Sequence, residues 1–140
     1  MSYLLDTNVV SEARRRGGEP RVSAWLASVV SDDLYLSVLV VGEIRRGVER
    51  LRRRDPVQAG VFEIWLDELQ RHFAERVLPI DLETAEEWGR ISAGDPVPVE
   101  DGLMAATAKV RDMVFVTRNT ADVARTGVRL LDPWDSAFSS

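Results

Sequence analysis

The sequence predicts a three-layer α/β/α fold with a central parallel sheet of about five strands. Short apolar runs, each about the length of a buried strand, recur along the 140 residues. Segments in which apolar residues repeat at helical spacing separate these runs. Such alternation is typical of parallel sheets, because each strand returns to the same edge through a helical crossover. No internal repeat or long linker divides the chain, so we expect one domain over residues 1–140.

The predicted strands are residues 3–5, 34–37, 76–80, 113–117 and 129–131. The predicted helices are residues 9–14, 20–30, 38–54, 57–75, 82–92 and 100–111. Pro20 suits the first turn of its helix, Pro56 ends the long helix before it, and Asp81 suits an N-cap. The helix over residues 57–75 has apolar residues at helical intervals, and the helix over residues 100–111 is rich in alanine.

Four acidic residues from distant segments are predicted to meet at one edge of this sheet, and they are Asp6, Glu43, Asp101 and Asp122. Asp6 ends the first strand, and Asp122 follows the fourth. A crossover helix runs antiparallel to the strands, so its N-terminus lies over their carboxyl edge, where ligands bind in open α/β sheets. Glu43 and Asp101 occupy the early turns of two such helices.

These carboxylates predict a site for a divalent cation. Glu43 lies on the apolar stripe of its helix beside Val40 and Gly47, where a carboxylate is costly unless it is paired or binds a metal. Two carboxylates about 4 Å apart repel by about 4 kcal/mol at an effective dielectric constant of 20. A cluster of them therefore needs a cation or shifted pKa values. Oxygen ligands suit Mg²⁺ or Mn²⁺ rather than zinc, and the sequence leaves open whether one or two ions bind.

Taken singly, most of these acids also have a structural explanation. Asp6 suits a turn or a helix cap, Asp101 is an acid in a first helical turn, and Asp122 suits a local cap. Asp81 and Asp132 also follow strands, but we interpret them as an N-cap and part of a terminal turn and leave them out of the site.

Four motifs resemble the PIN-domain proteins and, within them, the VapC-type (FitB-like) toxins of type II toxin–antitoxin pairs. They are LLDTNVVSE, VLVVGEIRRGV, EDGLMAATA and FVTRNTADV, and they occur in family order over nearly the whole chain. The resemblance implies a PIN fold and a ribonuclease dependent on Mg²⁺ or Mn²⁺, with Asp6, Glu43, Asp101 and Asp122 as catalytic and metal-binding residues. It further implies an RNA substrate, 5′-phosphate and 3′-hydroxyl products, a homodimer, and a cognate antitoxin that blocks the site.

Two features depart from the family pattern. Gly102 stands where a better helix former is usual, and we expect it to loosen the first turn of that helix. Residues 17–33 contain no motif that aligns with the family, so we assign no RNA contact to them.

The mechanism that we expect is hydrolysis of a phosphodiester by a metal-activated water, which attacks phosphorus in line. Polar residues at the same edge could orient metal-bound waters or phosphate in a second shell around the site, and they are Thr7, Asn8, Thr117 and Asn119. Asn8 and Asn119 equally suit a helix N-cap or a turn.

Two other functions remain open. A non-catalytic PIN-like binding module would pair with a partner without metal chemistry. A phosphoryl-aspartate phosphatase or receiver would use Asp6 as its nucleophile. That phosphatase needs a second acid where Asn8 stands, and a receiver needs a lysine late in the sheet, whereas Lys109 lies in a helix. His72 is the one histidine of the sequence, so neither a histidine triad nor a histidine-rich metal site is available.

Composition limits the partners and the location that we expect. Eighteen basic and 23 acidic residues give a net charge of −5, which argues against non-specific binding of nucleic acid. We interpret the arginine clusters as solvated faces. The absence of cysteine, of a membrane-length apolar run and of a signal peptide predicts a cytoplasmic protein without disulfides. Trp65, with Phe62 and Leu69, is a candidate surface for the dimer or the antitoxin.

Overall fold

The computed structural model describes residues 1–94 and 96–135, which contain a parallel sheet with the strand order β3-β2-β1-β4-β5. The strands are β1 (Tyr3–Leu5), β2 (Leu34–Ser37), β3 (Val77–Leu78), β4 (Val114–Val116) and β5 (Leu130–Leu131). The helices are α1 (Thr7–Arg14), α2 (Pro20–Ser28), α3 (Val38–Arg52), α4 (Pro56–Phe73), α5 (Leu82–Ser92), α6 (Val99–Val110) and α7 (Thr120–Val123). Three 3-10 turns join them: η1 (Ser31–Asp33), η2 (Ala74–Arg76) and η3 (Ala124–Thr126).

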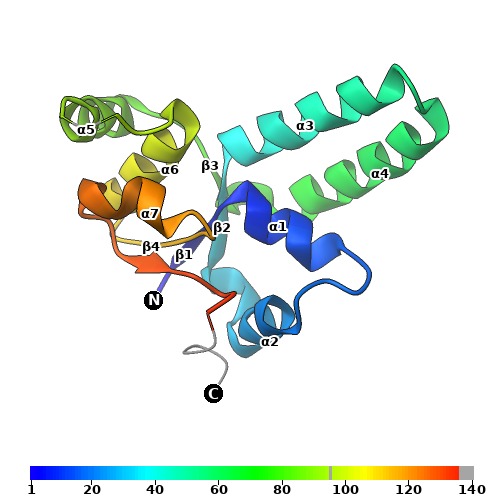
Figure 1. Ribbon diagram of the computed structural model, residues 1–140, viewed down its shortest axis with the longest axis horizontal. Helices are drawn as coiled ribbons and strands as arrows, with labels where there is room; N and C mark the ends of the chain where they lie inside the picture. Colours follow the sequence, from blue (N-terminus) through cyan, green and yellow to red (C-terminus); the bar gives the residue numbers. More distant parts are fainter. Residues whose placement is uncertain (95, 136–140) are drawn as a thin grey trace.

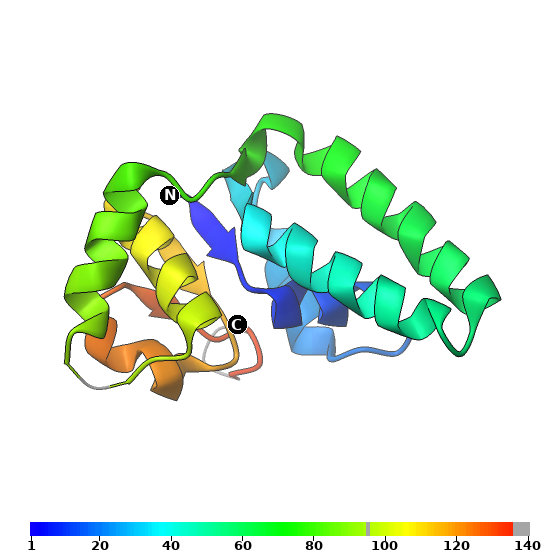
Figure 2. The same ribbon diagram turned by 90° about the horizontal axis from the view of Figure 1, so that it is seen from above.

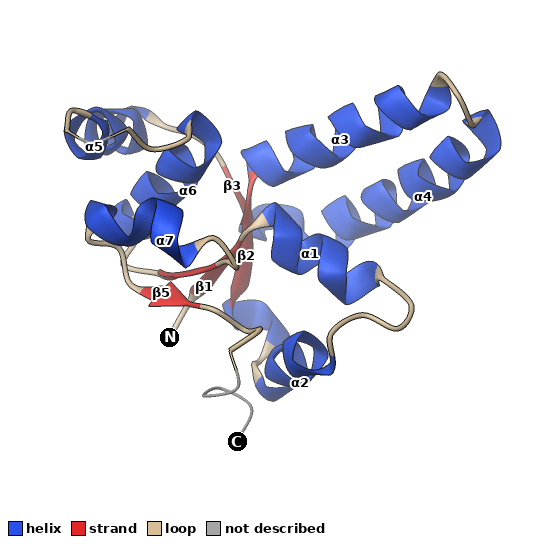
Figure 3. Cartoon of the chain, in the orientation of Figure 1, coloured by secondary structure: helices blue, strands red, loops and turns tan. Residues whose placement is uncertain are grey.

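Helices cover both faces of the sheet, which confirms the predicted three-layer α/β/α class. The connections from β1 to β3 cross the sheet in one direction, and those from β3 to β5 cross it in the other. Right-handed crossovers then place α1 to α4 on one face and α5 to α7 on the opposite face, as Figures 1 and 3 show. The paired helices α3 and α4 extend away from the sheet (Figure 2). No helix among the described residues is long and apolar enough to cross a membrane.

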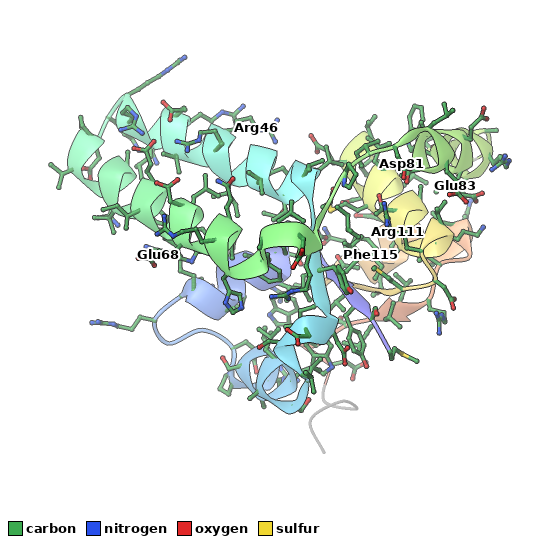
Figure 4. The ribbon with its side chains drawn as sticks, turned by 180° about the vertical axis from the view of Figure 1, so that it is seen from behind. Arg46, Glu68, Asp81, Glu83, Arg111 and Phe115 are labelled. Atoms are coloured by element: carbon green, nitrogen blue, oxygen red, sulfur yellow. The ribbon has the colours of Figure 1, made fainter. Side chains whose placement is uncertain are left out.

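The core lies on both sides of the central strand β1. Leu4, Leu36 and Phe115 come from three adjacent strands and are fully buried, and Figure 4 labels Phe115 between the layers. Short runs of this kind are apolar at nearly every position because both faces of a parallel sheet are covered. Trp25 closes the core at α2 through an edge-to-face contact with Tyr3, with ring centroids 5.2 Å apart.

Capping decides where several helices begin and end. The helix predicted from residue 9 begins at Thr7, because the Asp6 carboxylate accepts a hydrogen bond from the Thr7 backbone N–H. Asp55 caps α4 by accepting from the backbone N–H of Gln58, so α4 begins at Pro56 and α3 ends earlier than residue 54. At its other end α4 stops at Phe73, two residues before the predicted end, and continues as the 3-10 turn η2.

The remaining differences are short. The strands predicted over residues 76–80, 113–117 and 129–131 lose one to three terminal residues, and the helix predicted over residues 20–30 ends at Ser28. Helix α7 has four residues, which is about one turn and too short for an apolar period to reveal. The predicted N-cap at Asp81 is confirmed, because its carboxylate accepts from the backbone N–H of Thr84 at 2.9 Å.

The expectation that Gly102 loosens α6 is wrong. Its backbone N–H donates to the carbonyl of Pro98 at 2.8 Å, so the first turn of α6 is closed. A Cβ atom at position 102 would lie 3.2 Å from Cδ1 and Nε1 of Trp88 on α5. The absence of a side chain therefore lets α5 and α6 pack closely, which holds Asp101 against the edge of the sheet.

We predict that Gly102→Ala destabilises the fold. An added Cβ gains up to about 1 kcal/mol of helix propensity, but the half-buried indole of Trp88 has to move, and overpacking costs about 1–3 kcal/mol. The expected net loss is about 1 kcal/mol in the free energy of unfolding, measured with urea. Gly89→Ala on α5 is the control, because its Cβ would meet nothing within 4 Å and should be stabilising. Equal stabilisation by both substitutions would show that Trp88 does not constrain position 102.

Candidate active site

Asp6 stands directly after the central strand, at the carboxyl edge of the sheet. Its backbone N–H donates to the carbonyl of Val116 on the neighbouring strand at 2.9 Å, so the chain stays tied to the sheet one residue beyond β1. The side chain is 4% exposed. A carboxylate this buried needs donors around it or a bound cation.

Three donors fix the orientation of the Asp6 carboxylate. Oδ1 accepts from the backbone N–H of Thr7 at 2.7 Å, and Oδ2 accepts from Thr117 Oγ1 at 2.6 Å and from Asn8 Nδ2 at 3.3 Å. Thr117 Oγ1 in turn accepts from the backbone N–H of Asn119 at 3.0 Å, which leaves its proton for Asp6. Burial raises the pKa of Asp6, and the bonds from Thr117 and Thr7 oppose that rise.

Glu43 reaches the same edge from the second turn of α3. Its side chain is half-buried, and burial is the main cause that raises the pKa of Glu43. The negative charge of Asp6 raises it further, while the Thr7 hydroxyl faces the carboxylate and lowers it. That hydroxyl is buried and makes no contact with full hydrogen-bond geometry. The effect of Asp6 on the pKa of Glu43 shows that the two carboxylates are close enough for their charges to interact.

Asp101 shows that all four acids share one electric field. Burial and the negative charges of Asp6, Asp122 and Glu43, in that order, raise the pKa of Asp101 to about 6. These acids come from the end of β1, from α3, from the first turn of α6 and from α7. The charges of Asp6, Asp122 and Glu43 therefore act on Asp101 at the carboxyl edge of the sheet. That the four acids form one metal-binding and catalytic site stays a prediction.

Asp122 is the outermost of the four acids. It is exposed, and its backbone N–H donates to the carbonyl of Asn119 at 3.1 Å, which forms the start of α7. Asn119 occupies the N-cap position of α7, but its side chain makes no capping bond. Asn8 is not a cap either, because Asp6 caps α1 and Asn8 donates to Asp6 instead.

Two charged residues lie beside this site that were not predicted from the sequence, Glu100 and Arg46. The negative charge of Glu100 raises the pKa of both Asp101 and Glu43, and the positive charge of Arg46 lowers the pKa of Glu43. The available signal was position along each helix. Arg46 is three residues after Glu43, on the same side of α3, and Glu100 directly precedes Asp101.

The chemistry of the donors fits a hard divalent cation. All the acids present oxygen, and two buried oxygens beside them, Thr7 Oγ1 and Asn8 Oδ1, have no hydrogen-bond partner in the protein. Mg²⁺ takes one or two carboxylates directly and keeps several waters, which such oxygens can bind. Within residues 1–94 and 96–135 no three acidic or histidine side chains are arranged to hold an ion.

Known proteins resemble this chain in sequence along nearly its whole length. Residues 3–128 match the PIN domain family. Toxin FitB of Neisseria gonorrhoeae is 35% identical over 136 residues, which cover 94% of this chain and 97% of FitB. VapC ribonuclease Y4jK of Sinorhizobium fredii is 32% identical over 143 residues, which cover 96% of this chain and 99% of that protein.

Solved structures agree with the sequence comparisons. The crystal structure of FitAcB from Neisseria gonorrhoeae has a TM-score of 0.87 and 36% identity, and the match covers 94% of this chain and 98% of that one. VapBC-1 from nontypeable Haemophilus influenzae has a TM-score of 0.74 at 19% identity, covering 96% and 100% of the two chains, and shares the fold. The chain belongs to the PIN-domain family. Within that family it is similar to proteins named Toxin FitB and VapC ribonuclease, which confirms the resemblance seen in its motifs.

We predict that Asp101 makes the stability of the metal-free protein depend on pH. Its pKa is raised from 3.8 to about 6, so the folded state favours the protonated form. The stabilisation is complete below pH 4 and is lost as the pH rises through about 6. In chelator, the melting temperature of the parent should therefore fall relative to that of Asp101→Asn between pH 4 and pH 6.5. Parallel melting curves across that range would contradict the raised pKa.

Proposed function

We propose that this chain is a divalent-metal-dependent endoribonuclease and the toxin of a toxin–antitoxin pair, with a single PIN domain over residues 1–140. The observation that carries the proposal is the approach of Asp6, Glu43 and Asp122 to Asp101, where burial and then their negative charges raise the pKa of Asp101 to about 6. Perturbed carboxylates gathered at the carboxyl edge of an α/β sheet are typical of a functional site. Relatives of nearly the same length carry the names toxin and ribonuclease, which supports the proposal.

We assign Asp6 and Asp101 as the residues that would hold the metal directly. Asp6 is fixed by three donors and Asp101 experiences the charges of the other acids. Mg²⁺ or Mn²⁺ bound there would lower the pKa of a coordinated water and offset negative charge on the phosphate. Glu43 and Asp122 would complete the site by binding the ion or by accepting hydrogen bonds from its waters, and would so orient the attacking water.

Polar residues beside the acids have positioning roles in this proposal. Thr117 donates to Asp6 Oδ2 and accepts from the backbone N–H of Asn119, so it keeps the carboxylate from rotating. Thr7 and Asn8 each present a buried oxygen without a protein partner, and both oxygens could accept a hydrogen bond from a bound water. Hydrolysis would leave a 5′-phosphate and a 3′-hydroxyl.

The phosphoryl-aspartate alternative gains no support from these contacts. Asn8 donates to Asp6 Oδ2, where a phosphatase of that kind needs a second acid. Lys109 is bound elsewhere, because its Nζ lies 3.2 Å from Glu87 Oε2 and donates to the carbonyl of Thr126 at 3.1 Å. Neither residue can then serve the chemistry of an aspartyl phosphate at Asp6.

The proposed partners are a cognate antitoxin and a second copy of the chain. A groove of about 300 Å³ begins at Thr7 and Glu43 and runs between α3 and α4 to Phe62 and Trp65. It connects the acidic site to the protruding pair of helices, so an antitoxin segment lying in it would cover the site. Solved structures similar to this chain include complexes described as toxin–antitoxin systems, which supports such a partner.

We predict that Asp6→Asn and Asp101→Asn each reduce RNA cleavage at least 100-fold in the presence of Mg²⁺ or Mn²⁺, and that chelator abolishes cleavage by the parent. Each substitution removes a carboxylate from the metal-binding set and leaves a side chain of the same shape. The rate of cleavage of a single-stranded RNA, followed on a gel, is the measurement.

Asp81→Asn is the matched control for both variants. Asp81 also follows a strand, but it caps α5 and pairs with Arg111 at 3.4 Å. Figure 4 labels both residues. Asparagine is an equally good N-cap, so Asp81→Asn should cut RNA at the rate of the parent. If Asp6→Asn and Asp101→Asn cut as fast as this control, the assignment of a ribonuclease site is wrong, and a binding module without chemistry becomes the better reading.

We also predict that the chain is a dimer in solution. Val57, Val61 and Ile64 expose apolar surface on α4, and a second copy can bury such a surface. Light scattering at several concentrations should give twice the chain mass of 15.7 kDa. A mass of one chain throughout the concentration range would reject the dimer.

A further inference from the structure

Arg46 lies beside the acidic site without being part of it. It is three residues after Glu43 on α3, and Figure 4 labels it near the middle of that helix. Its Nη2 is 3.8 Å from Glu100 Oε1 on α6. The pair therefore joins helices from opposite faces of the sheet, across the edge where the four acids lie.

This pair borders a hollow that adjoins the site. The hollow has a volume of about 170 Å³ and is lined by Val38, Leu39, Gly42, Glu43, Arg46 and Glu100. Glu43 therefore contacts both the acidic site and this hollow. The charge of Arg46 acts on Glu43, and the charge of Glu100 acts on Glu43 and on Asp101. The phosphate backbone of an RNA strand that lies over the acids would pass Arg46 where the strand enters or leaves the acidic site.

The contact between Arg46 and Glu100 contributes little to stability. The two side chains are 53% and 50% exposed, and their charged atoms are 3.8 Å apart. Solvent screens exposed ion pairs of this kind almost completely. Arg46 is therefore free to exchange Glu100 for another anion, and a guanidinium group matches the oxygens of a phosphate with two parallel donors.

The neighbouring arginine is held differently. The Nη1 of Arg45 lies 2.5 Å from Glu63 Oε2 on α4 and 3.3 Å from Glu49 Oε2, one turn further along α3. Because these two carboxylates already balance the charge of Arg45, its guanidinium group is not available to bind a further anion. The adjacent positions 45 and 46 thus place the same side chain on two different sides of α3, one toward the hollow and one away from it.

We infer that Arg46 is a positioning residue that binds a phosphate of the RNA next to the scissile one, and that Glu100 holds the Arg46 side chain at the mouth of the site until a phosphate replaces it. The inference rests on the proposed ribonuclease function. It also accounts for how a protein with a net charge of −5 and an acidic site could accept a polyanion, because one cation at the mouth offsets repulsion where the substrate enters.

The test compares Arg46→Gln with Arg45→Gln in the full-length chain. Cleavage of a single-stranded RNA with Mn²⁺ is measured at several salt concentrations. Arg46→Gln should raise KM about tenfold, the effect of losing one charge-assisted hydrogen-bonded contact, and leave kcat within about twofold. The slope of log KM against log salt should fall by about 0.7, as expected for one phosphate contact to a single strand. Arg45→Gln should match the parent in both.

Two further variants separate phosphate binding from a structural role. Arg46→Lys keeps the charge but not the two parallel donors, so it should restore the salt slope of the parent and only part of the loss in KM. If Arg46 acted only through its contact with Glu100, Glu100→Gln would raise KM as Arg46→Gln does. Glu100→Gln removes the competing anion and should lower KM. If Arg46→Gln has the KM and the salt slope of the parent, or if only kcat changes, the inference is wrong.

A binding measurement distinguishes this inference from the proposed function. The Asp101→Asn variant, with and without Arg46→Gln, is titrated with labelled single-stranded RNA and followed by fluorescence anisotropy. Weaker binding of the double variant supports the role of Arg46 even if the parent cuts no RNA, in which case the ribonuclease proposal alone fails. Equal binding by the two overturns the role of Arg46 even if the parent cuts RNA.

Discussion

The candidate site is built around the hydrogen bond between Thr117 Oγ1 and Asp6 Oδ2, which spans 111 positions of the chain over 2.6 Å. It joins the ends of β1 and β4, the two strands whose pairing forms the middle of the sheet. The same carboxylate caps α1, so one buried group ends a strand, begins a helix and points into the site. A carboxylate with its donors in place is oriented before any ligand arrives, which lowers the entropic cost of binding one.

The other acids depend on packing around that centre. Glu43 is brought to the edge by α3, whose apolar residues Val40, Ile44 and Val48 are buried. Asp101 is brought there by α6, which approaches α5 closely because position 102 has no side chain. Apolar burial on both faces of the sheet thus holds these carboxylates together against their repulsion. Burial, together with the neighbouring negative charges, raises the pKa of Glu43 and of Asp101. Gathering like charges in this way lowers the stability of the fold, and such a cost is typical of functional sites.

Charged residues around the edge divide into two groups. Arg45 and Arg52 bind Glu63 on α4 and hold the α3–α4 pair together, so these two arginines form ion pairs between helices rather than the solvated face expected from the sequence. Arg46 faces the acids and Glu100 instead. Runs of like residues in a helical sequence need not share a role, because successive side chains point about 100° apart around the axis.

The sequence by itself determined the class of fold, the strands and nearly all of the helices. The spacing of apolar residues and the residues that begin or end an element are local properties of the chain. It also predicted that Asp6, Glu43, Asp101 and Asp122 lie at one edge, since the chain direction of parallel strands places strand ends and helix starts together. Only the tertiary structure decided that Thr117 holds Asp6 in addition to its cap partner Thr7, that Gly102 tightens α6 instead of loosening it, and that Arg46 and Glu100 border the site. Each of these depends on which side chains meet across different elements, and no local pattern along the chain specifies such contacts.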